Sequence, residues 1–147
     1  MSVSLYGSGN TVIQVVNSAF SIDVSTSSTS YVTSGVYATI TPQSTTSKIL
    51  VLVNSSAAFS GTSGNGLKCQ LWRGTSGAAS GSTIAANPFY FQINSSSSYS
   101  PFSINYLDSP SSTSALTYTV MMASASSGTV GFISGFGAGN NLATITL

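Results

Sequence analysis

The sequence contains almost no charge. Of its 147 residues, three are Lys or Arg and two are Asp or Glu, so 3% are charged, where about 25% is usual. Histidine and glutamate are missing altogether. The charged positions are Asp23, Lys48, Lys68, Arg73 and Asp108. Three scattered cations cannot neutralise a phosphate backbone, so we expect no nucleic acid as a partner.

The missing side chains also exclude most enzyme chemistry. Without histidine there is no Ser-His-Asp triad, and two aspartates with one cysteine are too few ligands for a dedicated metal site. Asp23 and Asp108 would have to pair in a glycosidase, but Asp108 opens the turn Asp108-Ser109-Pro110, where we expect it to cap the backbone. Ser47-Lys48 is better explained by a lysine at the mouth of a strand with its ammonium in water. The sequence therefore predicts no enzyme, no cofactor and no metal.

Cysteine, helix-forming residues and long apolar runs are scarce as well. The single cysteine, Cys69, permits no internal disulfide, and its apolar-leaning surroundings predict a small core residue. Met1-Ser2-Val3-Ser4 has neither the basic nor the apolar region of a secretory signal. No apolar run approaches the roughly 20 residues of a membrane helix, so we expect no membrane insertion. Helical periodicity is absent, and Glu, Lys and Arg are rare.

What the sequence does contain is short apolar runs among hydroxyl residues. Serine and threonine make up about a third of the chain, yet 41% of residues are hydrophobic, which indicates a folded domain. The run Ile49-Leu50-Val51-Leu52-Val53 predicts a strand buried on both faces. Further strands are expected at residues 11–17, 31–32, 36–41, 67–73, 89–93, 102–107, 115–123, 129–133 and 142–147. Residues 19–24 alternate weakly and predict either a second strand or an irregular edge. This spacing predicts one all-β domain over residues 11–147, an antiparallel β-sandwich of jelly-roll type, preceded by an arm at residues 1–10.

Several of these segments, taken in order, resemble a known family. The chain is similar to the β-rich virion surface proteins of tailed bacteriophages, which include tail-fibre-like and head decoration proteins. The segments that carry the resemblance are Thr11-Val12-Ile13-Gln14-Val15-Val16, Tyr31-Val32, Ala38-Thr39-Ile40-Thr41-Pro42, Ser47-Lys48-Ile49-Leu50-Val51-Leu52-Val53, Leu71-Trp72-Arg73-Gly74, Tyr106-Leu107-Asp108-Ser109-Pro110, Thr117-Tyr118 and Ala143-Thr144-Ile145-Thr146-Leu147. The resemblance implies a sandwich that assembles as a trimer on the virion exterior. Two departures are the short arm in place of a shaft and the end at Leu147 without an acidic dipeptide.

Surface chemistry also favours an oligomer. In several strands, apolar residues alternate so that they point to both sides of the strand. A two-layer sandwich has only one inner face per sheet, so a second buried surface is expected. We predict a trimer interface at Ile49, Val51, Val53, Phe89 and Phe91. Leu5 and Tyr6 of the arm are predicted to dock on the virion, by strand addition or apolar contact.

Two functions remain open at this point. The first is a capsid decoration (cement) protein on the head exterior that contacts the major capsid protein, which the short arm and the lack of a shaft favour. The second is a tail-fibre tip or receptor-binding module whose loops, at residues 61–66, 74–82 and 94–100, contact the host surface. Trp72 and Tyr90 are expected in the core or a subunit interface, while Tyr99, in a serine tract, is the candidate for contact with a receptor or surface glycan.

Overall fold

A computed structural model describes most of the chain. The described residues are 11–21, 23–61, 66–75, 77, 80–85, 89–92, 97–126, 128–132 and 142–147. Leu5 and Tyr6, the predicted docking residues, lie outside them. Every regular element in the described ranges is a β-strand, and no helix there is long and apolar enough to cross a membrane. The prediction of an all-β fold is confirmed.

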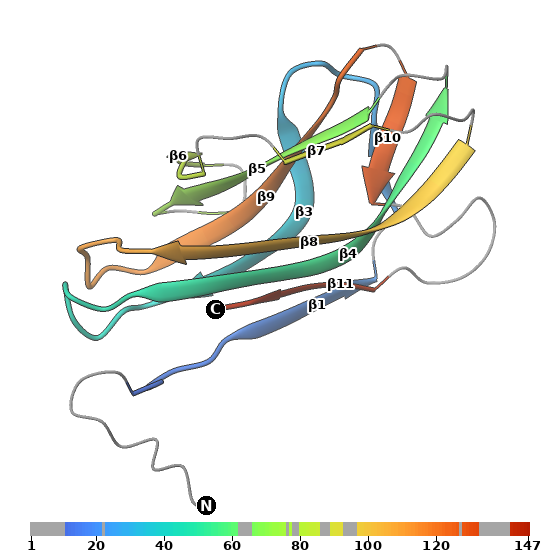
Figure 1. Ribbon diagram of the computed structural model, residues 1–147. Helices are drawn as coiled ribbons and strands as arrows, with labels where there is room; N and C mark the ends of the chain where they lie inside the picture. Colours follow the sequence, from blue (N-terminus) through green and yellow to red (C-terminus); the bar gives the residue numbers. More distant parts are fainter. Residues whose placement is uncertain are drawn as a thin grey trace, which may run out of the picture.

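The first sheet is built around two long antiparallel strands. β4 (Ile49–Gly61) and β8 (Ser97–Asp108) pair from Ile49↔Asp108 to Ser60↔Ser97. On its other edge β4 pairs first with β11 (Leu142–Thr146) and then with β10 (Gly128–Phe132). β11 in turn pairs with β1 (Asn17–Ser21), and β10 with β2 (Val24–Thr26). Across the sheet the order is therefore β8, β4, then β11 and β10 end to end, then β1 and β2 end to end (Figure 1).

The second sheet packs against the first. β9 (Leu116–Ser124) lies between β3 (Val32–Ile40) and β5 (Gly66–Gly74). The far edge of β5 pairs with β7 (Phe89–Gln92) and with the two-residue β6 (Ser82–Thr83). All pairings are antiparallel, and a register shift in β3 between Thr33 and Tyr37 includes Gly35, whose φ of +80° suits glycine. Two antiparallel sheets packed face to face are a β-sandwich, as the sequence predicts.

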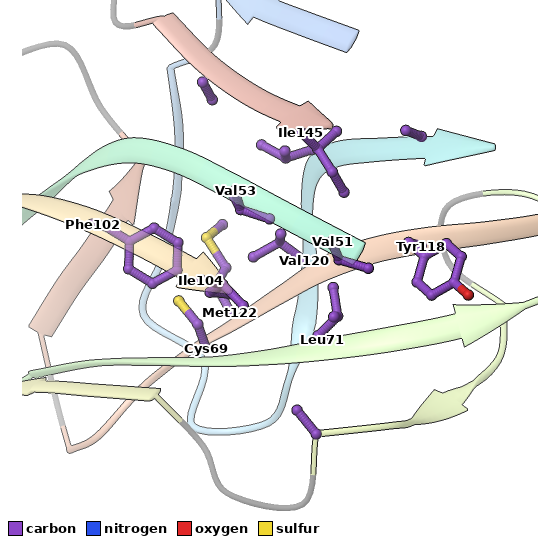
Figure 2. Close-up of a cluster of buried hydrophobic side chains, with 14 of the residues drawn as sticks. Val51, Val53, Cys69, Leu71, Phe102, Ile104, Tyr118, Val120, Met122 and Ile145 are labelled. Atoms are coloured by element: carbon purple, nitrogen blue, oxygen red, sulfur yellow. The ribbon is translucent and has the colours of Figure 1, made fainter. Parts of the chain in front are cut away.

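The core fills the space between the sheets. Figure 2 shows side chains of β4, β5, β8, β9 and β11 converging there. Buried apolar members include Val51, Val53, Leu71, Ile104, Val120, Met122 and Ile145. Phe102 and Phe132 meet edge to face, with ring centroids 5.2 Å apart. Cys69 is fully buried among these residues, which confirms its predicted place in the core.

The strand at Ile49–Gly61 differs from its prediction. Ile49, Val51 and Val53 point into the core with exposed fractions of 6%, 0% and 0%, whereas Leu50 is 50% exposed on the outer face. The prediction of a strand buried on both faces is wrong, because on the outer face Leu50 is half exposed and Leu52 is only partly buried. The strand buried on both faces is β9, the middle strand of the second sheet, where every residue is buried.

The same burial corrects the predicted trimer interface. A side chain already buried within one chain has no surface left for a partner, so Ile49, Val51 and Val53 are not interface residues. Phe89 and Phe91 lie in β7, where their backbone pairs with Cys69 and Leu67, and their side chains are outside what the structure describes.

Two strand boundaries also differ from the sequence prediction. The first strand begins at Asn17 rather than at residue 11, although Val16 still exchanges backbone hydrogen bonds with Leu147. β8 begins at Ser97, inside the serine tract, because its partner β4 continues to Gly61 as one strand and carries the pairing along.

Candidate functional site

A buried ionic cluster joins the two sheets at one end of the sandwich. The carboxylate Oδ2 of Asp108, on β8, accepts a hydrogen bond from Arg73 Nη1 of β5 and one from the Tyr118 hydroxyl of β9, each at 2.6 Å. Asp108 is 6% exposed and Tyr118 is fully buried. The prediction that Asp108 caps its own turn is therefore replaced by a contact between sheets.

The electrostatics of this cluster agree with a structural role. Burial, and next the hydrogen bond to Asp108, raise the pKa of Tyr118 far above its ordinary value. Burial alone would lower the pKa of Arg73, but its hydrogen bond and charge interaction with Asp108 raise it overall. The cluster thus keeps Tyr118 neutral and Arg73 charged. We find no set of three or more His, Cys, Asp or Glu side chains gathered as metal ligands within the described ranges.

A groove of about 870 Å³ lies at the end of the first sheet where β4 begins. We call it the apolar groove. One wall is formed by residues 11–15, and the other by the start of β4 with Leu107 of β8. Its floor reaches the core at Ile40, Ile49 and Leu147, which are 4%, 6% and 7% exposed.

The walls of the apolar groove expose large apolar side chains. The exposed fractions are 78% for Val12, 59% for Ile13, 64% for Val15, 50% for Leu50 and 56% for Leu107. Leu50 and Leu107 face each other in register across β4 and β8. Among the lining residues, all of which the structure describes, only Lys48 has a charged side chain. The described residues therefore place several large, exposed apolar side chains together around one groove.

The outer face of the second sheet carries a different surface. Tyr37, Thr119, Trp72 and Thr83 follow one another in register across β3, β9, β5 and β6. We call them the aromatic row. The indole Nε1 of Trp72 donates to Gln70 Oε1 at 3.0 Å, and the Thr83 hydroxyl donates to the same oxygen at 3.0 Å.

Trp72 of the aromatic row bears on a sequence prediction. Trp72 is half-buried on the outer face, so of the two predicted positions the core is wrong and a subunit interface stays a prediction. Tyr37 is 41% exposed and packs against Phe20, with ring centroids 5.6 Å apart. The hydroxyl of Thr119 is buried without a hydrogen-bond partner. The backbones of Tyr90 and Tyr99 pair with Lys68 and Ala58, and their side chains lie outside the described part of the chain.

Comparison with known proteins does not assign this chain. No protein-family model matches it, and no curated protein matches it significantly.

Sequence reasoning missed the apolar groove, although part of its signal is present. Residues 12–16 read Val-Ile-Gln-Val-Val, so apolar residues would point to both sides of an extended segment, as in Ile49–Val53. A pattern of this kind shows that a segment has two apolar sides. It does not show which of the two faces the core, and only the pairing of β11 with β4 decides that.

Proposed function

We propose that this protein is a non-enzymatic structural component of a tailed-bacteriophage virion, a capsid decoration (cement) protein on the head exterior. The observation that carries the proposal is the apolar groove on a chain with five charged residues. A free domain with that surface and so little charge would be poorly protected against association. Burial against the major capsid protein or against sister copies removes the exposed leucine, valine and isoleucine side chains from water.

The strand order supports the virion assignment. When β1 and β2, β6 and β7, and β10 and β11 are each counted as one broken strand, eight strand positions remain. The first sheet then has the order 1-8-3-6 and the second 2-7-4-5. We infer a jelly roll from this order, a fold found in viral capsid proteins and lectins. Fold alone does not determine function, so the order supports the proposal without carrying it.

We further propose that the assembled form is a trimer. The contact surface lies on the Leu50 side of β4 and on Leu107, because these side chains are the exposed ones at this end of the sheet. A closed ring lets three copies bury the same surface without leaving one open. Light scattering on the purified protein at micromolar concentration tests this directly, and a well-behaved monomer would contradict it.

Copy number per virion tests the decoration role. A cement protein is expected at hundreds of copies per particle, and a fibre tip at a few to a few tens. Gel densitometry of purified particles against the major capsid protein measures the ratio. A protein that is absent from the particle, or present at a few tens of copies or fewer, would rule out the decoration role.

The second candidate, a tail-fibre tip or receptor-binding module, is favoured by the aromatic row. Exposed Tyr37 and half-buried Trp72, beside the Gln70 amide, combine flat rings with hydrogen-bonding groups, as a surface that contacts a host glycan requires. If this role is correct, Trp72→Ala should reduce binding to host cells, whereas Thr129→Ala, on the outer face of the other sheet, should leave it unchanged.

A further inference from the structure

We propose that the outer face of the second sheet binds an acidic oligosaccharide, with the Lys68 ammonium holding a carboxylate of the sugar and Trp72 stacking on a sugar ring. This inference deepens the receptor-binding candidate, on which it rests. It names the chemical class of the ligand and the residue that selects the acid over the neutral sugar.

β5 presents three long side chains with polar groups on this face. Lys68, Gln70 and Trp72 are each half-buried, and they alternate with core residues that are fully buried. Because side chains on a strand alternate between its two sides, these three point outward together. Lys68 and Trp72 lie about 13 Å apart along the strand, with Gln70 between them. A row of this length suits an oligosaccharide better than a single sugar.

The Gln70 amide holds its neighbours in place. Its Oε1 accepts hydrogen bonds from the indole Nε1 of Trp72 and from the Thr83 hydroxyl, each at 3.0 Å, and these two donors occupy both lone pairs of the oxygen. Burial, and next a charge interaction with Cys69, raise the pKa of Tyr31, and a hydrogen bond with the Gln70 side chain opposes that rise. Since the polar edge of the Trp72 indole is engaged within the chain, the ring is fixed before a ligand arrives, which lowers the entropic cost of binding.

Lys68 supplies a positive charge without an acidic partner. Its ammonium lies 5.7 Å from the centre of the Tyr31 ring and donates a hydrogen bond to the carbonyl oxygen of Thr29 at 3.4 Å. An ammonium has three N–H donors, so this contact leaves two of them for a ligand. Asp108 is paired with Arg73, and no carboxylate in the described part of the chain forms an ion pair with Lys68. The group that complements this position is therefore an anion.

The other groups on this face suit a sugar. Tyr37 and Trp72 carry aromatic rings on which the apolar side of a pyranose stacks, and the exposed Thr83 hydroxyl oxygen can accept a hydrogen bond from a sugar hydroxyl. Among the described residues that face outward on this sheet, Lys68 is the single charged side chain. One cation among neutral groups matches a mostly neutral ligand that bears a carboxylate, whereas a nucleic acid calls for several cations.

Fluorescence titration of the unmodified protein tests the ligand class. Trp72 is the single tryptophan, so a change in its emission reports binding at this face. The probes are a panel of uronic-acid and sialic-acid oligosaccharides, each titrated beside the same molecule with its carboxylate reduced to an alcohol. We expect a saturable change with acidic probes and at least about tenfold weaker binding of their reduced forms, because the reduced forms lose a charge-assisted hydrogen bond.

Two results would overturn the inference. One is the absence of a saturable change with every acidic probe, and the other is equal binding of the acidic and reduced forms. Neither result by itself removes the receptor-binding candidate. If Trp72→Ala still reduces binding to host cells, that candidate survives while the acidic ligand does not.

Replacing single lysines tests the residue that selects the acid. Lys68→Gln should raise the dissociation constant of the acidic probes by at least about tenfold and leave that of the reduced forms within about threefold. Lys68→Arg keeps the charge and should retain the preference for the acidic form. The matched control is Lys48→Gln, which removes the same charge from an exposed position before β4 of the other sheet and should change binding less than about threefold. Equal effects of Lys68→Gln and Lys48→Gln would show that net charge attracts the probe, and the inference would be wrong.

Discussion

Replacing Tyr118 by phenylalanine measures how much one hydrogen bond to a buried carboxylate contributes to the free energy of unfolding. The change removes the hydroxyl that donates to Asp108 Oδ2 at 2.6 Å and leaves the ring in the core. Asp108 then keeps Arg73 as its donor, at 2.6 Å. A hydrogen bond to a charged, buried acceptor contributes about 1.5–3 kcal/mol, so we expect Tyr118→Phe to lower the free energy of unfolding by about 2 kcal/mol.

Tyr106→Phe is the matched control. The Tyr106 hydroxyl donates to the backbone carbonyl of Ile84 at 2.8 Å, which is a neutral acceptor at a half-buried position. Its loss should cost about 0.5–1.5 kcal/mol. With a urea dependence of about 2 kcal/mol per M for a domain of this size, the midpoints should fall by about 1 M for Tyr118→Phe and by about 0.25–0.75 M for Tyr106→Phe.

The assay is urea unfolding at fixed protein concentration, followed by the fluorescence of Trp72, the single tryptophan. A double-mutant cycle with Asp108→Asn tests whether the effect comes from the hydrogen bond to Asp108. The decrease in unfolding free energy caused by Tyr118→Phe should be smaller by at least about 1 kcal/mol when the carboxylate is already replaced. If Tyr118→Phe costs no more than Tyr106→Phe, or if the cycle shows no coupling, the reasoning about the ionic cluster is refuted.

Three further predictions concern pH, an unpaired hydroxyl and a close backbone contact. Burial raises the pKa of Tyr118 and Cys69 above their ordinary values of 10.0 and 9.0, so the unfolded chain loses these protons first. These two groups should leave stability unchanged between neutral pH and about pH 8 and lower it above about pH 9, by up to about 1.4 kcal/mol per pH unit per group. A flat urea midpoint from about pH 8 to 11 would contradict this. Thr119→Val removes a buried hydroxyl without a partner and should leave the melting temperature unchanged or raise it; a clear decrease would reveal a hydrogen bond. Gly131→Ala places a methyl group against the backbone carbonyl oxygen of Val24 and should cost about 1–3 kcal/mol by urea unfolding, unless β2 separates from β10 freely.

The sequence by itself determined the class of fold and part of the core. Alternation at residues 67–71 placed Leu67, Cys69 and Leu71 on one buried face, because side chains on a strand alternate between two sides whatever the partner strand is. The absence of histidine and glutamate limited the chemistry before any contact was known. These are local or compositional properties, so they can be read from the chain directly.

Tertiary structure decided which face of each strand is covered, and which distant groups meet. Ile49–Val53 and β9 both carry apolar residues on their two sides. β9 is nevertheless buried on both faces, while Leu50 is half exposed. The difference arises because only the neighbouring elements determine what covers an outer face. Asp108 reads as a turn residue, but β5 and β9 bring Arg73 and Tyr118 to it from the opposite sheet. The apolar groove forms where residues 11–15 lie opposite the start of β4 and Leu107, and only the assembled sheet brings these distant segments together.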